Sequence, residues 1–202
     1  MRHIICFLMA LLIMCTTLAS VAEEDNAFSY RNGIQFGDSR DAIREKELGR
    51  GSNVADTGEL LYKDIVLSGI KHSSIYYRFD DEGCLSGIKL RYDNTNPNLQ
   101  DCDYHGSKYD IIENGLQEKY GDEVDSELLM APGGVVFDLR EHYYGVTFIK
   151  SSQRIVNYDE KQEIVIQHVL AKAPDGDFYW HYLSYQLLDK NAENVDIVLK
   201  DL

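Results

Sequence analysis

The chain is poor in several residue types, and each shortage narrows the class of protein. Only 3 of its 202 residues are proline and only 1 is tryptophan. The 20 lysines and arginines are outnumbered by 34 aspartates and glutamates, giving a formal net charge of −14. This charge repels phosphate backbones at long range, so we expect no nucleic-acid partner. A composition of 44% hydrophobic and 27% charged residues is typical of a globular domain and not of a disordered chain.

Long apolar runs are absent beyond the N-terminal segment. Residues 1–22 carry a cation at Arg2, an apolar run, and the small residues Ser20 and Ala22 ahead of a cleavage point. The sequence therefore predicts a signal peptide over 1–22 and a secreted or cell-envelope location. A retained anchor and a lipid attached at Cys15 are the alternatives, and we expect no other association with a membrane.

Cysteine is scarce as well. Two of the four cysteines lie in the predicted signal peptide, which leaves Cys84 and Cys102 in the mature chain. An even pair in an oxidising compartment favours a Cys84–Cys102 disulfide. Two reduced, buried thiols are the alternative.

Catalytic and metal-binding motifs are missing too. No two of the histidines beyond residue 22 lie three or four residues apart, and the chain lacks zinc-protease, nucleophile-elbow and phosphate-loop patterns. We therefore expect no metal and no cofactor. Catalytic activity stays undecided, with a non-catalytic role favoured.

Two units of a helix followed by strands are predicted. In the first, residues 23–101, Asp38 or Ser39 caps a helix over 39–48. Strands with alternating apolar residues follow over 60–66, 73–80 and 84–93, and Asp80–Gly83 forms a hairpin turn. Turn-forming residues at 94–101 mark the boundary of this unit.

The second unit, residues 102–160, repeats this order as an internal repeat. Tyr109, Ile112, Leu116 and Tyr120 form a helical stripe closed by Gly121. Strands are expected over 135–140, 143–150 and 154–158, and residues 161–202 form a C-terminal β extension with strands at 163–171 and 178–188. The fold class is α+β, with tandem helix-plus-antiparallel-sheet units and the helices packed on one face of the sheet.

The alternation of apolar and polar residues along the strands predicts which side chains lie on each face of this sheet. Ile75, Tyr77, Phe79, Ile88, Leu90 and Tyr92 should face the helix, as should Val135, Phe137, Leu139, Val146 and Phe148 in the second unit. A set of cations and aromatic residues should then face outward as a binding platform, because Tyr and Arg are enriched at interfaces. Its members are Tyr76, Arg78, Lys89, Arg91, Arg140, Tyr143 and Trp180. A solvated sheet face, with Trp180 in the core, is the alternative.

The segment from Tyr30 to Ile43 (YRNGIQFGDSRDAI), followed by strands and a second helix-plus-sheet unit, resembles a known group. That group contains the bacterial beta-lactamase inhibitory proteins and the small outer-membrane assembly lipoproteins. Its members share a Gly-x-Ser-type helix start, which here is Gly37-Asp38-Ser39. The resemblance implies a bacterial envelope or secreted protein that works by binding another protein.

Three functions follow as hypotheses. The preferred one is an exported, non-catalytic protein that recognises another macromolecule, most simply a protein, through the exposed sheet face. The second is a secreted hydrolase whose site combines His142 or His181 with nearby acids. The third is a structural envelope component without a ligand. A hydrolase predicts a histidine with a perturbed pKa in a closed pocket, whereas a binding protein predicts an open face.

Overall fold

The computed structural model describes residues 28–48, 52–56, 59–92, 102–124, 128–130, 134–142, 144–174 and 179–190. The predicted signal peptide, Cys15 and Tyr143 lie outside these residues. Among the helices of the described residues, none combines the length and the apolar character needed to cross a membrane.

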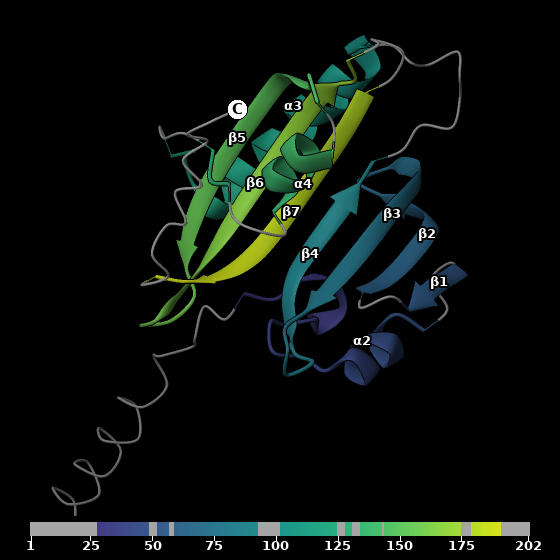
Figure 1. The fold of residues 1–202 in the computed structure, drawn as a ribbon, viewed down its shortest axis with the longest axis vertical. Coiled ribbons are helices and arrows are strands. Elements are labelled where there is room, and N and C mark those ends of the chain that lie inside the picture. The colour runs from purple at the N-terminus through teal and green to yellow at the C-terminus, as the bar shows by residue number, and fades with distance from the viewer. Residues whose placement is uncertain are drawn as a thin grey trace, which may run out of the picture.

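A seven-stranded antiparallel sheet forms the centre of the α+β fold (Figure 1). Its strands are β1 (Ser52–Asp56), β2 (Glu59–Leu67), β3 (Ile70–Phe79), β4 (Leu85–Arg91), β5 (Thr147–Asn157), β6 (Gln162–Lys172) and β7 (Tyr179–Asp189). Their order across the sheet is β1-β2-β3-β4-β7-β6-β5. The strands of the predicted C-terminal extension, β6 and β7, therefore lie inside the sheet, and β7 joins its two halves by pairing with β4. The internal repeat stays a prediction.

The hairpin between β3 and β4 forms at the predicted turn. The backbone amide of Gly83 donates to the carbonyl of Asp80 at 3.0 Å, and Gly83 has a φ of 79°, a conformation that glycine adopts without strain. The Asp80 side chain also accepts from the amides of Glu82 and Cys84. This turn fixes the register in which Tyr76 faces Lys89 and Arg78 faces Gly87.

Two of the helices agree with the sequence pattern. The helix α2 (Arg40–Lys46) begins after Ser39, whose side chain accepts from the amide of Ala42. The helix α3 (Cys102–Tyr120) is followed by Gly121, which has a φ of 83°. A short 3-10 turn, η1 (Arg31–Gly33), precedes α2.

The main core lies between one face of the sheet and the helices α2 and α3. Ile43 of α2 and Ile112 and Leu116 of α3 pack here against alternate residues of β2, β3, β4, β6 and β7. All six side chains of the first unit that were predicted to face the helix belong to this cluster or pack against it. We call this side of the sheet the α3 face.

The segment 135–140 was predicted as a strand, and that prediction is wrong, because Val135–His142 form the helix α4. Val135, Val136 and Leu139 are buried, and this spacing is that of one helical face. They pack with Val169, Ala171 and Trp180, which point away from the α3 face. Figure 1 shows α3 behind the strands β5, β6 and β7 and α4 in front of them. We call this second side the α4 face.

The strands expected over 143–150 and 154–158 are replaced by one strand, β5, which begins only at Thr147, after a turn at 144–145. The pairing of β5 with β6 continues through Ser151, Ser152 and Gln153, so no break separates the two segments. A register shift between Phe148 and Lys150 turns Phe148 toward the cluster beneath α4.

The predicted Cys84–Cys102 disulfide is absent, because Cys84 is a free cysteine in the structure. Cys84 immediately precedes the first residue of β4, whereas the chain reaches α3 and Cys102 only after leaving the far end of β4. His105, in the first turn of α3, has its ring 6.0 Å from that of His181, whose neighbour Tyr182 pairs with Arg91 at the far end of β4. The seven residues of β4 put this end roughly 20 Å from Cys84, well beyond the span of a disulfide.

Candidate binding site on the α4 face of the sheet

Four predicted platform residues share one face of two neighbouring strands. Tyr76 and Arg78 lie on β3, and Lys89 and Arg91 lie on β4. The core residues Ile75, Tyr77, Ile88 and Leu90 alternate with them and pack on the α3 face. These four residues therefore lie on the α4 face, opposite the main core, as the alternation along the strands predicted.

A small pocket of about 130 Å³ opens among these side chains. Tyr76, Arg78 and Lys89 line it together with Glu59 of β2 and Ser184 and Gln186 of β7. Gly87 of β4 also lines the pocket and lies opposite Arg78 and Gln186 in the sheet. The missing side chain at Gly87 leaves the recess open between longer neighbours. Arg91, two residues beyond Lys89, is not among the lining residues.

The two cations at the pocket are each held by one carboxylate. The Nε atom of Arg78 donates to Oε1 of Glu59 at 3.3 Å, and Nζ of Lys89 donates to Oδ2 of Asp138 in α4 at 2.8 Å. Lys89 also lies 5.1 Å from the centre of the Tyr76 ring, within the range of a cation–π contact. All four ion-pairing side chains are between 21% and 35% exposed, so the cations are fixed in place yet reachable.

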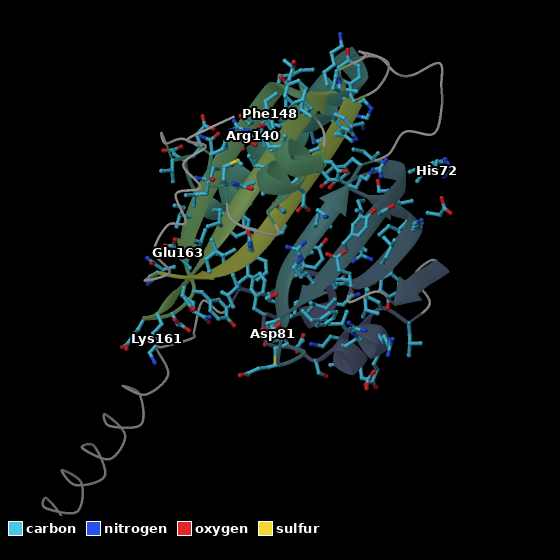
Figure 2. The ribbon with its side chains drawn as sticks, viewed as in Figure 1. His72, Asp81, Arg140, Phe148, Lys161 and Glu163 are labelled. Atoms are coloured by element: carbon cyan, nitrogen blue, oxygen red, sulfur yellow. The ribbon has the colours of Figure 1, made fainter. Side chains whose placement is uncertain are left out.

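Arg140 does not join this group. Asp138 faces Lys89, and a residue two positions further along a helix points about 200° away from it. Arg140 accordingly lies on the other side of α4, with its guanidinium 5.5 Å from the centre of the Phe148 ring of β5. Figure 2 shows the two side chains close together.

Trp180 was predicted to extend the platform, and this prediction is wrong. Its side chain is only 3% exposed and belongs to the cluster beneath α4, with Val169, Ala171 and Leu139. Trp180 is buried because α4, a segment that was expected to be a strand, covers this part of the sheet. Tyr143 lies outside the described residues, so its predicted place on the platform stays a prediction.

Sequence reasoning missed the pocket-lining residues Gly87, Glu59, Ser184 and Gln186. Gly87 carried a usable signal, because an isolated glycine within a strand pattern often marks a close approach or an open space. Ser184 and Gln186 reach the pocket only because β7 pairs with β4, and no local pattern indicates that pairing.

The histidine of the hydrolase hypothesis lies on the other side of the sheet. His181 of β7 is fully buried, and its Nε2 atom is 2.9 Å from Nε2 of His168 in β6. The Nδ1 atom of His168 is 2.8 Å from Oε2 of Glu113 in α3. The side chain of His142 lies outside the described ones.

A wide groove runs beside this cluster, between α3 and β5. Glu113, Ser152 and Arg154 line it, and neither His168 nor His181 is among the lining residues. A substrate in the groove would therefore meet the carboxylate and not an imidazole. Among the described residues, no three His, Cys, Asp or Glu side chains are grouped so as to hold a metal ion.

Comparison with models of protein families, with curated proteins and with solved structures finds no match. The resemblance to the beta-lactamase inhibitory group therefore stays an expectation from sequence.

Proposed function

We propose that the protein is an exported, non-catalytic binding protein that recognises another protein through the α4 face of its sheet. One observation carries the proposal: Tyr76, Arg78 and Lys89, singled out by the sequence pattern, line a single pocket over Gly87. Export rests on the predicted signal peptide, and the family resemblance points to the same kind of role.

The chemistry of the pocket suits a protein partner. Tyrosine and arginine contribute large, stiff surfaces with hydrogen-bonding ends, and the strongest interface contacts are anchors that fill well-formed recesses. The hydrogen-bonded strands β3, β4 and β7 make the base of this recess rigid. Arg78 and Lys89 are each paired with one carboxylate, yet both keep N–H groups beyond the one that the carboxylate accepts from, so the face retains charged donors for a partner.

Site-specific photo-crosslinking tests the proposal directly. The aromatic photoreactive residue p-benzoylphenylalanine replaces Tyr76 in the full chain, expressed in its native producer, and adducts are identified after irradiation. The matched control places the same residue at Ile111, which is 60% exposed on α3, on the other side of the sheet. We expect a discrete protein adduct from position 76 and none from position 111.

A second variant separates binding from folding. Gly87→Leu places a side chain into the pocket, and the first atom of that side chain meets only ordinary contacts, the nearest being Cβ of Arg78 at 3.5 Å. The position-76 adduct should disappear in Gly87→Leu while the melting temperature is retained. The same adduct from both positions, no adduct at all, or an adduct that survives in the folded Gly87→Leu variant contradicts the proposed function.

A further inference from the structure

We infer that the pocket over Gly87 takes a carboxylate, and specifically an acidic side chain presented by the partner protein. The inference rests on the proposed function, because it names the chemistry of the group that docks there. It is drawn from the donors left at the pocket, the size of the recess and the position of its counter-charges.

Hydrogen-bond donors are left over at the pocket. Arg78 has five N–H groups, and among the described residues only its Nε is engaged, by Glu59. Lys89 has three N–H groups, and among the described residues its ammonium bonds only to Asp138. The hydroxyl of Ser184 adds a neutral donor on the β7 side. A carboxylate has two oxygens that accept several hydrogen bonds and donate none, so it complements this set.

The size of the pocket limits what can enter. A recess of about 130 Å³ lies below the range of roughly 300–1,000 Å³ in which drug-sized molecules bind. It has room for the end of one side chain, while the rest of the partner would lie on the surrounding face. Gly87 sets this depth, because every other residue at the pocket has a side chain.

The counter-charges are placed so that the cations stay available. Glu59 approaches Arg78 from β2, and Asp138 approaches Lys89 from α4, so each carboxylate reaches its cation from outside the β3–β4 pair. The terminal nitrogens of Arg78 are not hydrogen-bonded to any described residue, and such a guanidinium end matches a carboxylate in bidentate fashion. Of the two carboxylates, Glu59 is the one that lines the pocket itself, so its replacement tests the effect of negative charge there.

The experiment uses the full chain and two matched probes, N-acetyl-glutamate methylamide and its neutral counterpart N-acetyl-glutamine methylamide. Binding is followed by the amide NMR signals of Gly87 and Lys89. We expect saturable shifts with the glutamate probe and at least tenfold weaker binding of the glutamine probe. Arg78→Gln should weaken glutamate binding by roughly tenfold or more, whereas Glu59→Gln should strengthen it by roughly fivefold.

The opposite signs of the Arg78 and Glu59 effects keep the inference falsifiable. Equal binding of both probes, no binding, or weaker glutamate binding in Glu59→Gln overturns it. Binding of inorganic phosphate without binding of the glutamate probe also overturns it, because the ligand would then be a phosphate and not an acidic side chain. If the crosslink at position 76 forms but the glutamate probe fails, the face still docks a protein and only the carboxylate inference falls. If the probe binds but no crosslink forms, the proposed function falls, and with it the assignment of the carboxylate to a partner protein.

Discussion

The imidazoles of His168 and His181 lie with their Nε2 atoms 2.9 Å apart, and both rings are fully buried. Glu113 accepts from Oγ of Ser152 at 2.7 Å and pairs with Nη2 of Arg154 at 2.6 Å. Burial by itself would raise the pKa of Glu113, but hydrogen bonds from His168, Ser152 and Arg154 outweigh it and lower the pKa to about 2. An ionised Glu113 assigns the donor to Nδ1 of His168, so the neutral ring accepts at Nε2 from His181.

This arrangement leaves no position at which another proton on either ring would have a hydrogen-bond acceptor among the described residues. A proton on Nε2 of His168 would meet the N–H of His181, and moving that hydrogen to Nδ1 of His181 would leave a buried donor that has no hydrogen-bond acceptor among the described residues. Burial lowers the pKa of His168, although the Glu113 hydrogen bond acts in the other direction. Burial is the main cause that lowers the pKa of His181 to about 2, and repulsion from His168 and His105 in their protonated forms acts in the same direction.

The fold should therefore lose stability as the pH falls below the ordinary histidine value of 6.5. The folded-state pKa of both histidines lies below that of the unfolded chain, so the unfolded chain binds protons first and acid favours unfolding. Each imidazole should contribute a slope of up to about 1.4 kcal/mol per pH unit in the free energy of unfolding. Glu113, whose folded-state pKa is also lowered, adds to the loss below pH 4.5.

Urea unfolding at a series of pH values between 8 and 4 measures this slope. Replacing His181 by glutamine removes one titrating group, and the slope between pH 6.5 and 5 should then be smaller than in the unchanged chain. A free energy of unfolding that is flat between pH 7 and 5 would show that the two imidazoles are not held neutral.

Glu113→Gln should destabilise the protein by about 2–3 kcal/mol, because the nearly buried Arg154 loses its charged partner. The matched control is Asp110→Asn, the same chemical change about one turn earlier on α3. Asp110 accepts from Lys150 at 2.6 Å, but its side chain is 61% exposed, and exposed pairs contribute at most about 1 kcal/mol. Chemical denaturation compares the two variants, and equal losses would contradict the difference in burial.

Local patterns predicted most elements of the fold but not all of them. The alternation in β3 and β4 and the stripe from Tyr109 to Tyr120 each extend over enough residues to define a period. Residues 135–140 are too few to define a period. Val135, Phe137 and Leu139 fit the alternation of a strand, whereas Val135, Val136 and Leu139 fit one face of a helix. Packing against Trp180 and Ala171 decides in favour of the helix, and the sequence does not show that contact.

The residues of the site could likewise be predicted only in part. The side on which Tyr76, Arg78 and Lys89 lie depends only on the parity of each strand, so it could be predicted. The contributions of Ser184, Gln186 and Asp138 depend on the β4–β7 pairing and on α4, which join segments about 50 to 100 residues apart in the chain. Long-range contacts of this kind leave no periodic signal.

Glycine changes in and after α3 should shift stability in opposite directions. Gly115 lies within the helix with open space around the position of a Cβ atom, so Gly115→Ala should stabilise the protein by about 0.5–1 kcal/mol. Gly121 has a φ of 83°, and alanine there should cost about 1–2 kcal/mol. Thermal unfolding compares the melting temperatures of the two variants with that of the unchanged chain. A higher melting temperature in both would show that α3 continues past Gly121.

Trp180 provides an internal probe of the region beneath α4, because it is the single tryptophan of the chain. A side chain that is 3% exposed and packed among Leu139, Val169 and Ala171 should emit at short wavelength and resist quenching by iodide. Its emission should shift to longer wavelength on unfolding, and Trp180→Ala should cost about 3–5 kcal/mol because it leaves a cavity. If the emission of the folded protein is instead long in wavelength and readily quenched, α4 does not cover the sheet, and Trp180 returns to the exposed platform that the sequence suggested.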